Sequence, residues 1–154
     1  MNWQASTLMI GNDHAGVVLK QHLVERLEAM LKTHPGLSII DTGPQSKDVA
    51  VDYPDQVHPV VKALATERSA GLLICGSGVG MTIAANRFSH VRAVRGTDPL
   101  SVQLARTHNN ANVLTLGERL IGQDMAWQCL ITLLITPFEG GRHARRVEKL
   151  VKMV

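Results

Sequence analysis

The chain has 154 residues, 45% of them hydrophobic and 19% charged, which is enough for one globular domain with a full core. A net charge of +3 and an aromatic content of 3% leave few side chains that could stack on bases, so nucleic acid is disfavoured as a partner. No apolar run reaches the length of a membrane span and residues 1–7 lack a signal-peptide pattern, so we expect a soluble, cytoplasmic protein without membrane association.

The first strand, loop and helix occupy residues 8–32. Residues 8–10 form a short apolar run, and apolar side chains recur at helical spacing over 17–32. Asp13 and His14 then fall in the loop at the carboxyl end of the strand, which is where open α/β sheets bind ligands. Asp13 is equally suited to cap the following helix, and the residues alone leave both roles open.

A second unit follows a Pro-Gly turn. Residues 37–40 predict a strand, residues 45–51 a polar and mobile loop, and residues 55–67 a helix. Tyr53, the only tyrosine in the chain, stands before this helix. Taken alone, it is predicted to be a packing residue with a solvated hydroxyl.

The most informative stretch is residues 71–86, GLLICGSGVGMTIAAN, which predicts a buried strand, a glycine-rich turn and a helix. The turn carries Gly76, Gly78 and Gly80, which let the backbone adopt unusual dihedrals and let a ligand approach the amides. The start of a helix favours an anion, so Cys75 at this turn is suited to act as a thiolate base or nucleophile. The alternative is a tight turn beside a small buried cysteine.

Neither a nicotinamide cofactor nor a metal is predicted. The GxGxxG fingerprint would need glycine at Met81, and the next strand, residues 92–94, ends at Arg95 instead of an acidic ribose partner. Arg95 could accept the 2′-phosphate of NADP, which is the weaker reading. Cys75 and Cys129 have no CxxC spacing, so no disulfide scaffold or zinc site is indicated, and Cys129 is expected in the core.

The next helix is predicted to start at residues 97–99 and to end at His108. Either Asn109 or Asn110 suits the left-handed position that ends a helix, and His108 in the last turn would be stabilised as a cation without any catalytic role. Residues 113–116 predict the fifth strand, and Arg119 lies in its exit.

Two further helices are predicted, over residues 123–135 and towards the carboxyl terminus. In the last helix Arg142 and Arg146 are four residues apart, so both guanidinium groups share one face and could bind a phosphate or carboxylate. From spacing alone, a solvated basic tail is the better interpretation.

These elements predict the α/β class: a single-domain, doubly wound, Rossmann-like sheet of five parallel strands with helices on both faces. The domain spans residues 1–154. Residues 137–154 form an extra helical extension with no following strand, so this extension is expected to pack on a partner subunit.

Several separated motifs resemble the sugar-phosphate isomerase family that contains ribose-5-phosphate isomerase B and the galactose-6-phosphate isomerase subunits. The motifs are GNDHAG at 11–16, VDYP at 51–54, ICGSGVG at 74–80 with AAN at 84–86, HNNAN at 108–112, and EGGRH at 139–143 with Arg146. The resemblance covers nearly the whole chain in order.

The resemblance implies an aldose-ketose isomerase that works through an enediolate without metal or cofactor, in a site shared by the subunits of a homodimer, or of a tetramer built from it. It implies catalytic roles for Cys75 as the base, Ser77 beside the anion hole, and Asp13 and His108 in opening the sugar ring. It implies substrate or phosphate contacts for His14, Tyr53, Gly76, Gly78, Val79, Gly80, Asn109, Arg119, Arg142 and Arg146. In one branch of the family the base is a glutamate at the position of Met81, and methionine cannot do that work.

The expected reaction interconverts ribose 5-phosphate and ribulose 5-phosphate. The alternatives are a six-carbon substrate, allose or galactose 6-phosphate, and a catalytically silent phosphosugar-binding protein. Cys75 beside an intact glycine turn argues against silence. Ser77, where some members have threonine, and the less typical sequence around Arg95 and Leu100 leave the sugar open.

Overall fold

The computed structural model describes residues 1–64 and 68–153. The elements, in chain order, are β1 (Thr7–Asn12), the 3-10 turn η1 (His14–Gly16), α1 (Val17–Leu31), β2 (Ser38–Asp41), α2 (Tyr53–Ala63), β3 (Ser69–Cys75), α3 (Val79–Ala85), β4 (Ala93–Arg95), α4 (Pro99–Asn109), β5 (Val113–Gly117), α5 (Gln123–Ile135) and α6 (Arg142–Val151).

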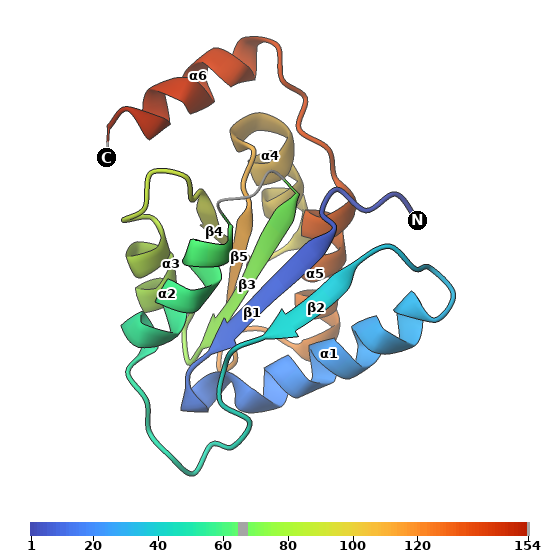
Figure 1. Ribbon diagram of the computed structural model, residues 1–154, viewed down its shortest axis with the longest axis vertical. Helices are drawn as coiled ribbons and strands as arrows, with labels where there is room; N and C mark the ends of the chain where they lie inside the picture. Colours follow the sequence, from blue (N-terminus) through green and yellow to red (C-terminus); the bar gives the residue numbers. More distant parts are fainter. Residues whose placement is uncertain (65–67, 154) are drawn as a thin grey trace.

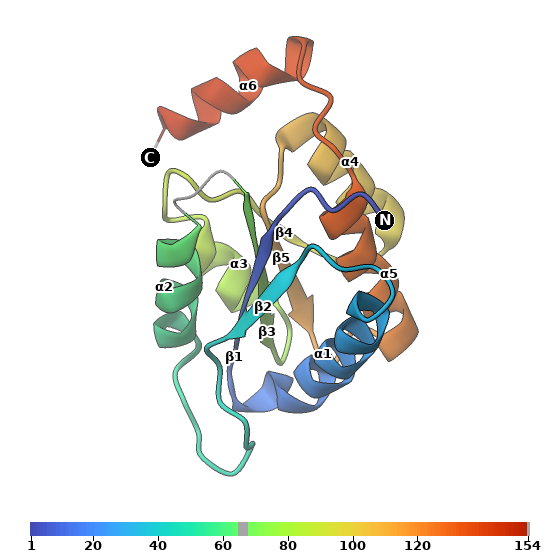
Figure 2. The same cartoon turned by 45° about the vertical axis from the view of Figure 1, so that its right-hand side comes forward.

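The strands form one parallel sheet in the order β2-β1-β3-β5-β4. Helices α1, α4 and α5 lie on one side of it and α2 and α3 on the other (Figures 1 and 2). The predicted five-stranded, doubly wound α/β fold with its additional carboxyl-terminal helix is therefore confirmed. Strand order reverses between β1 and β3, which creates a crevice at their carboxyl ends.

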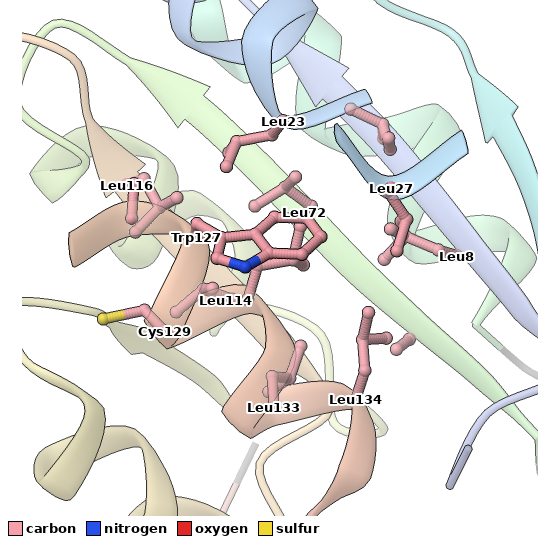
Figure 3. Close-up of a cluster of buried hydrophobic side chains, with 14 of the residues drawn as sticks. Leu8, Leu23, Leu27, Leu72, Leu114, Leu116, Trp127, Cys129, Leu133 and Leu134 are labelled. Atoms are coloured by element: carbon pink, nitrogen blue, oxygen red, sulfur yellow. The ribbon is translucent and has the colours of Figure 1, made fainter. Parts of the chain in front are cut away.

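Strand β3 separates two hydrophobic cores because its side chains alternate between the faces of the sheet. Leu72 and Ile74 pack into the core under α1 and α5, whereas Leu73 and Cys75 pack into the core under α2 and α3. Figure 3 shows the first core, where the Trp127 ring of α5 lies among leucines of the sheet and of α1. This double burial explains the continuous apolar run that predicted the strand.

Several element boundaries differ from the prediction. Helix α2 begins at Tyr53, two residues early, because Pro54 is well placed in a first helical turn. It ends at Ala63, and residues 65–67 of the predicted helix lie outside the described part of the chain. Strand β4 lies one residue later than predicted. Residues 45–51 contain no helix or strand.

Other local predictions are confirmed. Asn110 adopts the left-handed conformation, with φ of 50°, and ends α4. Cys129 is fully buried. Within the described residues, no helix is both long and apolar enough to cross a membrane.

Helix α6 lies beyond one end of the sheet and covers neither of its faces (Figures 1 and 2). It packs on α4, at the end of the sheet opposite to the strand arrowheads in both ribbon views (Figures 1 and 2). Val147 is buried, but Leu150 and Val151 on the same helix remain 45% and 41% exposed. The extension therefore leaves apolar side chains uncovered within one chain.

Candidate active site

A cavity of about 290 Å³ lies at the carboxyl ends of the central strands, where the strand order reverses. Its walls come from the loops after β1, β3 and β5 and from the first turns of α2 and α3. The lining residues are Asp13, His14, Ala15, Tyr53, Cys75, Gly76, Ser77, Gly80, Arg119 and Leu120. Sequence reasoning found all of these except Ala15 and Leu120, which carry no reactive group.

The structure shows Asp13 in the capping role and also places it in the wall of the cavity. Its carboxylate accepts a hydrogen bond from the Ala15 amide at 2.9 Å and so caps η1, and the residue also lines the cavity. Its own amide donates to the Ile74 carbonyl at 3.0 Å, which ties the end of β1 to β3. Next to it, Nδ1 of His14 accepts a hydrogen bond from the Val51 amide at 3.3 Å.

A backbone amide of the glycine turn contacts the Cys75 thiol. The Gly78 amide donates to Sγ of Cys75 at 3.1 Å, and Gly78 adopts φ of 75°, a left-handed conformation that glycine accepts without strain. The Val79 amide donates to Oγ of Ser77 at 3.3 Å. Met81 is fully buried in the core, so it offers nothing to the cavity. Cys75 and Ser77 are therefore the side chains of this turn that line the cavity with a sulfur or oxygen atom.

Two glycines allow large side chains to approach the turn. A Cβ on Gly80 would lie 2.7 Å from the Tyr53 ring, so this ring rests directly on the glycine. A Cβ on Gly76 would lie 3.3 Å from the Arg119 guanidinium. The backbone amide of Arg119 also donates to the Gly76 carbonyl at 3.1 Å. The Tyr53 phenol and the Arg119 guanidinium thus both line the cavity beside the turn that follows Cys75.

Four predicted site residues lie elsewhere. His108 and Asn109 end α4, and Arg142 and Arg146 lie on α6, at the opposite end of the sheet (Figures 1 and 2). The seven residues of β3 alone span roughly 20 Å. Within a single chain, these four residues therefore lie far from Cys75.

The residues at the end of α4 and on α6 form a second cluster, in which neighbouring charges shift the pKa of a histidine. The rings of His108 and His143 stack with centroids 4.4 Å apart and planes at 11°. Burial lowers the pKa of His143, and the nearby positive charges of His108, Arg142 and Arg146 lower it further, against the opposite effect of Glu139. The arrangement places the guanidinium groups of Arg142 and Arg146 near an imidazole whose protonated form is disfavoured.

His108, Glu139 and His143 also bring potential metal ligands within 4.8 Å of one another, a grouping that sequence spacing concealed because a loop and two helices supply them. The two imidazole planes are almost parallel, so their in-plane lone pairs do not converge on one ion. Nε of Arg142, 3.4 Å from Nε2 of His143, would also repel a cation. The parallel rings and the neighbouring arginine therefore disfavour a metal ion in this group.

Two larger cavities, of about 440 and 510 Å³, lie near the carboxyl-terminal end of α6. The first is mostly apolar and includes Asn109, Leu150 and Val151 in its lining. The second is lined in part by Arg92 and Arg106, whose pKa values are lowered by burial. Both arginines donate to backbone carbonyls, which is a structural role.

The fold and the small cavity define a doubly wound α/β protein with a pocket at the carboxyl ends of its central strands, where sheets of this kind bind small molecules. Residues 8–150 match the model of the Ribose/Galactose Isomerase family, and the chain belongs to this family, as the motifs predicted. It is thus an aldose-ketose isomerase by family.

The chain is 42% identical over 148 residues to ribose-5-phosphate isomerase B of Escherichia coli, with 93% of each chain covered. Among solved structures, it resembles ribose 5-phosphate isomerase B of Anaplasma phagocytophilum, with a TM-score of 0.89, 42% identity and coverage of 97% and 99% of the two chains. It also resembles the Mycoplasma genitalium enzyme with bound ribulose-5-phosphate, with a TM-score of 0.83, 34% identity and coverage of 96% and 95%.

Proposed function

We propose that this protein interconverts ribose 5-phosphate and ribulose 5-phosphate, with Cys75 as the base. The observation that carries the proposal is the Cys75 thiol in the small cavity, with the Gly78 amide 3.1 Å from its sulfur and a glycine-rich helix start around it. The 42% identity to the Escherichia coli enzyme and the ribulose-5-phosphate bound to the Mycoplasma genitalium relative support this choice of substrate.

The proposed reaction needs a base, an anion hole and a remote anchor. The Cys75 thiolate removes the proton from C2 of the open-chain aldose. The C–H electron pair forms the C1–C2 double bond, and the carbonyl π pair moves onto O1, where the backbone amides of residues 76–80 stabilise the oxyanion. O1 takes up a proton, O2 loses one, and the thiol returns its proton to C1 as the C2 carbonyl forms.

The remaining groups of the cavity bind and prepare the sugar in this proposal. Asp13 acts in opening the ring, Tyr53 contacts the substrate, and His14 and Arg119 bind the phosphate. Arg119 suits this role because its guanidinium lies beside Gly76 in the lining of the cavity. A charge-assisted contact of this kind supplies orienting energy that does not depend on the reacting carbons.

We further propose that a second copy of the chain completes the site. His108, Asn109, Arg142 and Arg146 lie far from Cys75 of their own chain, and α6 exposes Leu150 and Val151. In a homodimer, residues 137–154 of one copy would lie against the other, and these four residues would assist ring opening and hold the phosphate. A tetramer would be a pair of such dimers.

A coupled assay with a panel of aldose phosphates tests the proposal. We expect the highest kcat/KM with ribose 5-phosphate and loss of turnover in Cys75→Ala, with binding of the sugar phosphate kept within about tenfold. Turnover of only allose or galactose 6-phosphate would assign a six-carbon substrate, and binding without turnover would make the protein a phosphosugar-binding module. Near-normal kcat in Cys75→Ala would refute the base and make Asp13 the next candidate.

A further inference from the structure

Lys20 is the largest fully buried side chain of the chain's described part, with 1% of its surface exposed. Its ammonium lies 2.9 Å from Oδ2 of Asp41, 2.7 Å from the Pro44 carbonyl and 3.4 Å from the Gly43 carbonyl. A buried ammonium is costly unless its three N–H groups find acceptors, and here residues 41–44 supply all three. Lys20 thus joins α1 to the segment that leaves β2.

The same segment is fixed from the sheet. The fully buried Asn12 donates from Nδ2 to the Pro44 carbonyl at 3.2 Å and to the Asp13 carbonyl at 2.9 Å. Thr42 donates from both its amide and its hydroxyl to the Ile10 carbonyl, each at 2.9 Å. Pro44 is therefore the point where α1, the end of β1 and this segment meet.

The other end of the connection reaches the cavity. After the exposed residues 45–50, the Val51 amide donates to Nδ1 of His14 at 3.3 Å. An imidazole nitrogen that accepts a hydrogen bond carries no proton, so the tautomer that fits this contact has its proton on Nε2. Nε2–H is then available as a donor to an anionic group in the cavity.

We propose that Lys20 is a positioning residue: its buried ammonium holds residues 41–44 in place, so that Val51 meets His14 and fixes its proton on Nε2. The consequence for substrate binding rests on the proposed phosphate contact of His14. Asp41 contributes through Lys20, because its carboxylate lies 2.9 Å from Nζ and orients that group.

Nitrogen NMR of the imidazole groups at pH 8 tests the geometry without activity. In the wild type, we expect His14 to show an unprotonated Nδ1 and a protonated Nε2. Lys20→Met, which keeps an unbranched side chain one atom shorter and removes the ammonium, should give a mixed tautomer of His14 and faster exchange of the Val51 amide. Asp41→Asn keeps the buried ammonium with its two carbonyl partners, so it should show a smaller change of the same kind and serves if Lys20→Met does not fold.

Kinetics separate positioning from general stability. Lys20→Met should raise KM for ribose 5-phosphate roughly tenfold, the loss of one charge-assisted contact, with kcat within about twofold. The matched control is Leu27→Ala, which opens a cavity in the core under the same helix and should lower Tm without changing KM.

The inference would be overturned if the nitrogen NMR spectrum of His14 were unchanged in both Lys20→Met and Asp41→Asn. This holds also if these variants had a lower Tm, because the lysine would then serve stability alone. A changed His14 spectrum with unchanged KM would support the positioning by Lys20 and remove His14 from the proposed phosphate site. The two ideas therefore fail separately.

Discussion

Replacement of Gly78 by alanine tests the glycine turn most directly. At φ of 75° a side chain costs about 1–2 kcal/mol. The new Cβ would also lie 3.0 Å from the carbonyl carbon and 3.2 Å from the oxygen of Leu116, in the central strand β5, where relief of the contact costs about 1–3 kcal/mol more. The sum of roughly 2–5 kcal/mol corresponds to a fall in Tm of roughly 5–15 °C for a chain of this length.

The same change should move the Gly78 amide away from Sγ of Cys75 and reduce kcat roughly 100-fold, the usual cost of losing one donor to a reacting anion. Thermal unfolding and the coupled isomerase assay measure the two effects. Gly122→Ala is the control, because Gly122 has φ of −74° and a Cβ there would meet no atom within 4 Å. Wild-type Tm in Gly78→Ala would refute the strain argument, and a lower Tm with unchanged kcat would refute the role of this amide.

Three other predictions follow from the site and the core. Mixing Cys75→Ala chains with Arg142→Ala/Arg146→Ala chains should restore activity if the site is shared, whereas a site complete within one chain would leave the mixture inactive; each arginine change alone should raise KM roughly tenfold. Activity should survive EDTA and need no nicotinamide, and recovery only after a divalent ion is added would contradict this. Burial raises the pKa of Cys129 to about 11 from 9.0, so the stabilising contribution of the buried neutral thiol is complete below pH 9 and is lost between pH 9 and 11. In denaturant unfolding, the free energy of unfolding of Cys129→Ala should therefore fall less steeply over this pH range than that of the wild type. Mass spectrometry at pH 8 should find iodoacetamide on Cys75 and not on Cys129.

The sequence predicted the cavity well because its key residues directly follow strands. Asp13, Cys75 and Arg119 stand just after or at the end of β1, β3 and β5, and parallel strands bring their carboxyl ends to one edge. Alternation of apolar residues with glycine turns is local information, so a reader of the chain can place these residues without knowing any distance.

Contacts between segments that are distant in the chain could not be predicted from the sequence. Lys20 resembled any lysine on a helix, and nothing in its neighbours showed that residues 41–44 would cover it. The distance of Arg142 from Cys75 depended on where the extension goes after α5, which spacing does not encode. The one-residue shift of β4 has a simpler cause, since this short edge strand is only half-buried and its apolar pattern does not fix its ends.

The five strands also differ in how easily they open. β2 and β4 have four and three residues and one neighbour each, whereas β1, β3 and β5 are paired on both sides. Local unfolding is cheapest where pairing and burial are least, so fluctuations on warming should begin at the two edges. Opening of β2 would free residues 41–44 and the support of His14, while the turn at Cys75, set between two paired strands, stayed folded. Substrate affinity should therefore decline at a lower temperature than the geometry around the thiol, and native-state hydrogen exchange would record that order.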